Sequence, residues 1–194
     1  MIPHDTITSS TNPRVREAAR LRDADARRAT GLTLVDGRRE LARAARAGVP
    51  IEQVFVDLDT AATLLTDADA AAATAGVDGD GRELPSLVAL AASGTRITGL
   101  SGRAFERIAF GGRNEGLVGV ARYRPGSLVP FAVAADRPVF IVEGIEKPGN
   151  LGAILRTADA AGLAGVIVCD GGTDAANPAV IRASLGTEIG RAHV

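Results

Sequence analysis

The sequence has 194 residues, 46% of them hydrophobic, and a formal net charge of −1. This length suffices for one large domain or two small ones, and the lack of an apolar run of about 18 residues argues against a membrane span. The N-terminus shows no basic-then-apolar signal pattern, so we expect a cytoplasmic protein. One cysteine and two histidines are too few for an internal disulfide or a structural zinc site, and we therefore expect no metal.

The charge is distributed unevenly along the chain. Residues 1–50 carry a net +4, residues 51–90 carry −7, residues 91–130 carry +4 and residues 131–194 carry −2. Basic segments of this kind are suited to phosphate contacts even in a chain without overall positive charge. All but one of the 22 basic residues are arginine, which a GC-rich genome explains as readily as selection for bidentate phosphate binding does.

The first 123 residues predict a compact α/β domain. Residues 13–29 form one predicted helix, which begins at Thr11-Asn12-Pro13 and stops at Gly31. Its arginines either face solvent or contact RNA. The remaining predicted strands are 32–35, 51–56, 96–98 and 117–123, and the remaining predicted helices are 38–47, 84–92 and 103–109. Residues 67–83 are acidic and rich in Ala and Gly, so we expect a mobile surface insertion there.

A second domain is predicted after a linker at residues 124–137, which contains several prolines and a glycine. Its strands, 139–142 and 166–169, are short apolar runs of the kind buried on both faces, and they alternate with helices at 150–161 and 178–185. This alternation predicts a parallel sheet. Cys169 is expected to be a small buried hydrophobe, and Asp170 either turns the following loop or binds a ribose.

Residues 143–158, EGIEKPGNLGAILRTA, join a strand to a helix, where open α/β sheets bind ligands. Asn150 is either the N-cap of this helix or a ligand for a substrate hydroxyl. Gly152 and Arg156 share a helical face, so either a ligand docks beside the guanidinium or Arg156 pairs with Asp159 or with an acid on a neighbouring element. The glycines fit neither G-x-G-x-x-G nor a G-K-[ST] phosphate loop, which disfavours a nucleotide-dependent oxidoreductase.

The pattern G-I-x-x-P-x-N-x-G-A-I-x-R-T-A resembles the first signature motif of the SpoU/TrmH methyltransferases of the SPOUT superfamily. The segment NPAVIRASLG at 177–186 is similar to the helix that follows in that family. The stretch VDGRRELARAARAGVPIEQVFV is similar to the ribosomal-protein-like RNA-binding domain that many members carry. The resemblance covers nearly the whole chain except residues 67–83.

The resemblance implies an enzyme that methylates ribose 2′-hydroxyls of RNA with S-adenosylmethionine, as a homodimer and on ribosomal more than on transfer RNA. It assigns Arg156 to activation of the hydroxyl or to phosphate anchoring, Asn150 to positioning, and Glu143 to an acid at the same site. The arginines then expected to contact RNA are Arg22, Arg27, Arg28, Arg38, Arg39, Arg43 and Arg182. The alternative is a ribosomal-protein-like RNA-binding module without catalysis.

The same resemblance predicts that the methyltransferase domain, residues 138–187, is incomplete. The family's later motifs, a G-x-E loop and a Ser-Leu-Asn segment threaded through a knot, do not occur in the sequence. Residues 188–194 depart from the expected apolar continuation and back-translate to a string that matches a common sequencing adapter. We therefore expect a non-native tail there, no cofactor binding by this chain alone, and an unfinished sheet with uncovered apolar strands.

Overall fold

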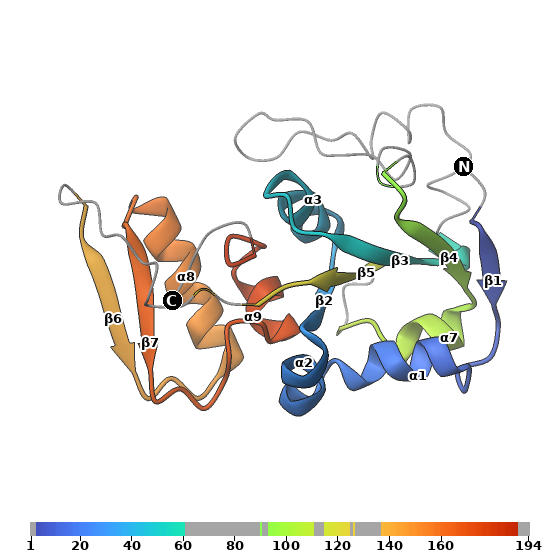
Figure 1. The fold of residues 1–194 in the computed structure, drawn as a ribbon, viewed down its shortest axis with the longest axis horizontal. Helices are drawn as coiled ribbons and strands as arrows, with labels where there is room; N and C mark the ends of the chain where they lie inside the picture. The colour runs from blue at the N-terminus through green and yellow to red at the C-terminus, as the bar shows by residue number, and fades with distance from the viewer. Residues whose placement is uncertain are drawn as a thin grey trace.

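The computed structural model describes residues 3–60, 90, 93–110, 115–124, 126 and 137–189. Two sheets lie along the long axis of the molecule, and helix α9 lies between them (Figure 1). The predicted insertion at 67–83, most of the predicted helix 84–92, most of the predicted linker and residues 190–194 lie outside the described residues. No helix in the described part is long and apolar enough to cross a membrane.

The larger sheet belongs to the N-terminal half. Its strands are β1 (Asp5–Ile7), β2 (Leu32–Asp36), β3 (Ile51–Asp57), β4 (Arg96–Leu100) and β5 (Leu117–Arg122), in the order β1-β4-β3-β5-β2. Strands β1, β4 and β3 run parallel, whereas β5 pairs antiparallel with both β3 and β2. The four predicted strands of this half are confirmed, and β1 is an addition.

Both faces of this sheet are buried, because successive side chains point to opposite sides. Val35, Val54 and Val56 pack on the side of helix α3 (Arg38–Arg46). Leu34 and Phe55, their neighbours in sequence, pack against helices α1 (Pro13–Arg20) and α7 (Gly102–Glu106). The N-terminal half is therefore an α/β domain, as the sequence predicts, with helices on both faces of its sheet.

The single helix predicted for residues 13–29 is wrong. The structure has two helices, α1 and α2 (Ala24–Thr30), separated by a turn at residues 21–23. Buried Leu21 ends the first helix, and Asp23 takes the extended backbone conformation of a helix start. The predicted stop at Gly31 is confirmed, since this glycine adopts the left-handed conformation, φ 68°.

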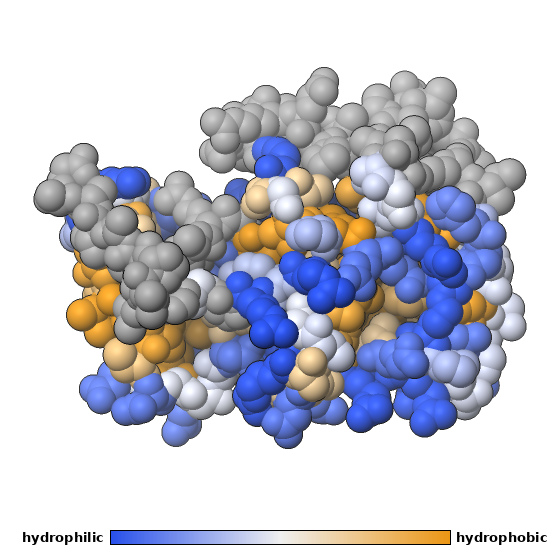
Figure 2. Space-filling view, viewed as in Figure 1, coloured by the Kyte–Doolittle hydropathy of each residue, from blue (hydrophilic) through white to orange (hydrophobic). Residues whose placement is uncertain are grey.

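The second sheet contains the parallel strands β6 (Val139–Glu143) and β7 (Gly165–Cys169), with α8 (Pro148–Ala160) and α9 (Pro178–Ala183) packed on it. The predicted parallel pairing is confirmed. The predicted burial on both faces is wrong, because Phe140 and Ile141 are 49% and 65% exposed. Cys169 is also exposed rather than buried, at the open end of β7. A hydrophobic surface is visible at the left of Figure 2, where Figure 1 places β6.

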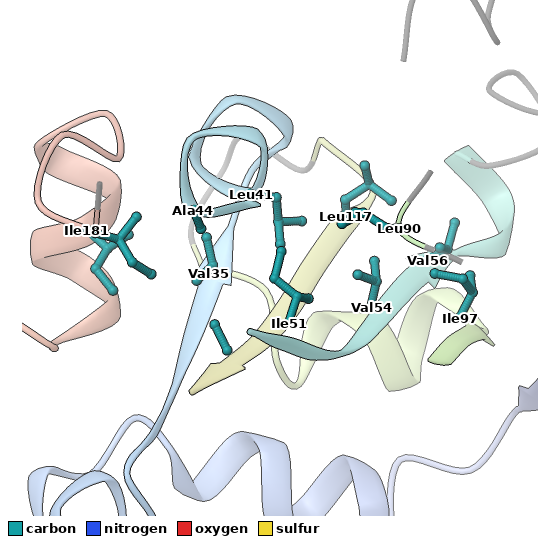
Figure 3. Packing of buried hydrophobic residues seen from close by; sticks show 12 residues of the cluster. Val35, Leu41, Ala44, Ile51, Val54, Val56, Leu90, Ile97, Leu117 and Ile181 are labelled. Carbon is teal, nitrogen blue, oxygen red and sulfur yellow. The ribbon is translucent and has the colours of Figure 1, made fainter. Parts of the chain in front are cut away.

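Helix α9 belongs to the cores of both halves. Val180 packs with α8 and the second sheet, whereas Ile181 is fully buried in the N-terminal cluster that contains Val35 and Ala44 (Figure 3). Just before α9, the buried Thr33 hydroxyl of β2 donates to the carbonyl of Ala176 at 2.6 Å. The two halves are therefore packed together through one short helix and the segments on either side of it.

Candidate functional site

The loops after β6 and β7 lie side by side at the carboxyl edge of the second sheet. Glu143, the last residue of β6, is exposed and pairs in register with Cys169. The backbone then turns at Gly144 (φ 67°), whose amide donates to the carbonyl of Cys169 at 3.1 Å. The amide of Gly172 in turn donates to the carbonyl of Ile145 at 3.1 Å. The loop that contains the signature motif is thus fixed against the loop that follows β7.

The proposed N-cap role of Asn150 is wrong. Lys147 is the N-cap of α8 and Pro148 is its first residue, so Asn150 lies inside the first turn. The backbone amide of Asn150 donates to the carbonyl of Lys147 at 3.0 Å, and the residue is exposed. A proline is favoured at the first helical position because it has no amide hydrogen to leave unsatisfied. Of the two roles considered for Asn150, contact with a substrate hydroxyl is the one that remains.

The predicted space beside Gly152 is also wrong. Gly152 is buried, and a Cβ atom at this position would lie 2.5 Å from the Cβ atom of Ala183 and 2.8 Å from the amide nitrogen of Ser184. The missing side chain therefore allows α8 and α9 to approach closely, and no ligand fits there. Leu151 and Leu155 of the same motif are fully buried in the core of the second sheet.

Arg156 is exposed on α8, and among the described residues it makes no ion pair, including the alternative pair with Asp159. Six residues separate it from Asn150, which amounts to about 9 Å along the axis and about 120° around it. The structure places Glu143 and Asn150 close to the carboxyl edge and Arg156 farther along α8. It does not place Asn150 and Arg156 on one face of the helix.

Three of the arginines predicted to contact RNA have structural roles. Arg27 is only 5% exposed and donates to the carbonyl of Leu21 at 3.0 Å and to Asp174 at 2.5 Å, so the prediction of an RNA contact for it is wrong. Arg182 of α9 forms an ion pair with Asp36 of β2 at 2.7 Å. Arg43 of α3 donates to the carbonyl of Leu185 at 3.0 Å. The contacts with Asp174, Asp36 and Leu185 each join the N-terminal half to the C-terminal half.

The contacts between the halves include two acids, Asp36, which the sequence analysis does not select, and Glu188, the first residue of the predicted non-native tail 188–194. The structure buries Glu188 and Ile189 of that range in the protein. Asp36 is 2% exposed, and burial raises its pKa, an effect that the amide of Phe110 and the guanidinium of Arg182 partly offset. Glu188 is fully buried and accepts a hydrogen bond from the Tyr123 hydroxyl at 2.6 Å. No sequence pattern indicates these pairs, because their members are 146 and 65 residues apart.

The other predicted arginines are more accessible. Arg38 and Arg39 at the start of α3 are half-buried, and Arg39 pairs with buried Glu40 at 3.2 Å. Arg22 and Arg28 are exposed, and both line a cleft of about 620 Å³ between α2 and the loop after β7. Arg20, which the sequence analysis does not select, lines the same cleft. The described residues contain no group of three or more His, Cys, Asp or Glu suited to a metal ion.

Comparisons with known proteins match both halves of the chain. Residues 12–119 match the family model of the MRM3-like substrate binding domain, and residues 137–189 match that of the SpoU rRNA Methylase family. The 23S rRNA (guanosine-2′-O-)-methyltransferase RlmB of Vibrio cholerae is 38% identical over 96 residues, which are 46% of this chain and 38% of RlmB.

Two solved structures have a similar fold. A crystal structure of an RNA 2′-O ribose methyltransferase is 32% identical, with a TM-score of 0.71, and the match covers 95% of this chain and 62% of that one. The AdoMet-bound rRNA methyltransferase of Sinorhizobium meliloti is 23% identical, with a TM-score of 0.71, over 95% of this chain and 61% of that one. The chain thus spans less than two thirds of each of these proteins.

Proposed function

This chain belongs to the SpoU rRNA methylase family and carries an MRM3-like substrate-binding domain, and from this we propose that it acts in the S-adenosylmethionine-dependent 2′-O-methylation of ribose in ribosomal RNA. The N-terminal half would bind the RNA, and the C-terminal half would contribute Glu143, Asn150 and Arg156 to the site of methylation. The names of the similar proteins, which include an RNA 2′-O ribose methyltransferase and RlmB, support this assignment.

The observation that carries the proposal is that some residues of the signature motif serve the fold, whereas others are exposed and do not. Pro148, Gly152 and Leu155 are explained by the start of α8, its close packing on α9 and the core. Asn150 and Arg156 are exposed and have no structural role among those considered for them. Asn150 lies at the carboxyl edge of a parallel sheet, where exposed polar side chains without a role in folding are typical of ligand contacts, and Arg156 is exposed farther along the same helix.

The described residues do not by themselves fit S-adenosylmethionine. Ligand pockets bury about 70–90% of a bound molecule of this size, whereas Glu143, Gly144, Cys169 and Asp170 at the carboxyl edge are all exposed. We therefore assign roles only toward RNA. The Asn150 amide would orient the ribose by a hydrogen bond to a hydroxyl. The Arg156 guanidinium, whose planar set of N–H donors matches phosphate oxygens, would anchor a phosphate rather than act as a base.

Mapping of 2′-O-methylation in the ribosomal and transfer RNA of the host, with and without the gene, tests the proposal. We expect one ribosomal position to lose its methyl group, and the gene as found in the host to restore it. The same gene with Arg156→Ala should restore little, whereas Arg103→Ala, which removes an exposed arginine of α7, should restore methylation fully. An unchanged map, together with RNA binding by the purified protein, would favour the non-catalytic RNA-binding module instead.

A homodimer, a cytoplasmic location and the preference for ribosomal over transfer RNA remain predictions from the family resemblance. Size-exclusion chromatography with light scattering tests directly whether the protein is a homodimer.

A further inference from the structure

The cleft between α2 and the loop after β7 connects the N-terminal half to the carboxyl edge of the second sheet. It measures about 620 Å³, within the range of about 300–1,000 Å³ that is typical of ligand sites. We propose that this cleft binds the ribose–phosphate backbone of the RNA next to the nucleotide to be modified. The proposal rests on the function proposed above, and it names a contact surface that the signature motif does not include.

One wall of the cleft comes from the turn that interrupts the predicted first helix. Because α1 ends at Arg20 and α2 begins at Ala24, the chain changes direction there, and Arg20, Arg22 and Arg28 all line the cleft. All three are exposed, and Figure 2 shows a hydrophilic surface where Figure 1 places α2. Arg28 is paired with Asp25, which leaves the guanidinium groups of Arg20 and Arg22 for successive phosphates.

Arg22 is held in place before any ligand binds. Its guanidinium lies over the ring of Phe110, 4.6 Å from the centroid, and donates to the carbonyl of Ala109. A cation–π contact of this kind orients the side chain without neutralising its charge. A guanidinium that is already ordered loses less conformational entropy when it binds a phosphate than a free arginine does.

The opposite wall comes from the loop after β7, with Gly171, Gly172, Thr173, Asp174 and Asn177 in the lining. Gly171 and Gly172 are exposed. Within the described part of the chain, no hydrogen bond is found from the amides of Gly171 and Thr173, so both remain able to donate to an anion. A Cβ atom added at Gly172 would lie 3.2 Å from the Cα atom of Glu146 in the signature loop. The cleft therefore lies directly beside that loop.

The acids in the cleft do not cancel its basic side chains. Its lining contains four arginines and three aspartates. Asp174 is paired with buried Arg27 at the base of the cleft, and Asp25 is paired with Arg28 at the surface. Among the charged residues of the lining, Arg20, Arg22 and Asp23 then remain, with a net charge of +1. A positively charged sulfonium such as S-adenosylmethionine is a poor ligand for this lining, whereas a polyanionic backbone suits it.

Fluorescence anisotropy with a labelled single-stranded RNA of mixed sequence tests the proposal, because backbone contacts do not depend on sequence. The test variant is Arg20→Gln/Arg22→Gln. The matched control is Arg103→Gln/Arg107→Gln, which removes the same charge from exposed positions of α7. For two lost contacts to single-stranded RNA, the slope of log affinity against log salt should fall by about 1.4, and affinity at 0.2 M salt should fall about tenfold.

The control variant should keep the slope of the unmodified protein. If the slope of log affinity against log salt were unchanged in the test variant, or fell equally in the control variant, the proposal that the cleft is a specific contact surface would be overturned. Photo-cross-linking with 4-thiouridine RNA gives an independent readout, since cross-links should map to residues 20–28 and 171–174 rather than to α7. The methylation map separates the two proposals: if the gene is needed for a ribosomal methyl group but the cleft variant binds RNA normally, only the cleft proposal fails.

Discussion

Glu188 presents the clearest energetic problem in the structure. Its carboxyl group is fully buried, and burial raises its pKa from 4.5 to about 8, although the hydrogen bond from Tyr123 lowers it in part. At about 1.4 kcal/mol per pKa unit, a rise of this size costs up to roughly 5 kcal/mol of stability above pH 8. Since small domains are stable by only about 5–15 kcal/mol, Glu188 should control the pH dependence of unfolding.

The direction of this dependence follows from proton binding. Between pH 4.5 and about 8 the folded protein retains the Glu188 proton and the unfolded chain releases it. The free energy of unfolding must therefore fall as the pH rises through this window. Glu188→Gln keeps a partner for Tyr123 but cannot ionise. We expect the variant to gain stability progressively above pH 5, by roughly 2–5 kcal/mol at pH 8.

Urea denaturation followed by circular dichroism at pH 5, 6.5 and 8 measures this effect. Glu17→Gln, at an exposed position of α1, is the control and should change stability by less than about 0.5 kcal/mol at each pH. If Glu188→Gln and the unmodified protein lost stability in parallel from pH 5 to 8, the carboxyl group would not be buried as the structure places it.

Two further substitutions test how α9 packs against β2 and against α8. Arg182→Met should destabilise the protein by about 3 kcal/mol, because it leaves Asp36 buried without its ion-pair partner. A double-mutant cycle with Asp36→Asn, measured by urea denaturation, should give a coupling energy of about 1–3 kcal/mol. Additive effects of the two substitutions on the unfolding free energy would contradict a direct pair. Gly152→Ala should lower the unfolding free energy by about 1–3 kcal/mol, because the new methyl group meets α9. Gly149→Ala is the control and should be neutral or slightly stabilising, because a Cβ atom there meets nothing within 4 Å. If thermal unfolding showed the same change in stability for both variants, the close approach of the two helices would be refuted.

The sequence predicts most strands and helices of the described part because hydrophobic periodicity, caps and breakers are local. Prediction from the sequence fails where a contact between residues far apart in the chain determines an element's boundary. The break between α1 and α2 accompanies the burial of Arg27, whose ion-pair partner Asp174 is 147 residues away. No pattern within residues 13–29 contains that information. The helix boundary at Asn150 is different, because Pro148 two residues earlier already indicates the correct start.

Gly152 shows a limit of another kind. A glycine on the inner face of a helix is equally expected where a ligand approaches and where another helix approaches, since both need the space of a missing side chain. Only the position of α9 distinguishes the two, and that position depends on Ile181 packing against the N-terminal sheet. The residue type alone therefore could not decide whether this face of α8 binds a ligand.

A count of charged residues in the sequence likewise does not show which side chains are accessible. Excluding the arginines that bind inside the protein changes the expected salt dependence of RNA binding. The net +4 of residues 1–50 counts every arginine as available, but Arg27 and Arg43 bind Asp174 and the carbonyl of Leu185 inside the protein. Neutralising these two should weaken the packing of the halves more than it weakens phosphate contact. The exposed guanidinium groups of the cleft, led by Arg22, should then account for most of the salt dependence, because only an accessible cation releases counterions from the RNA.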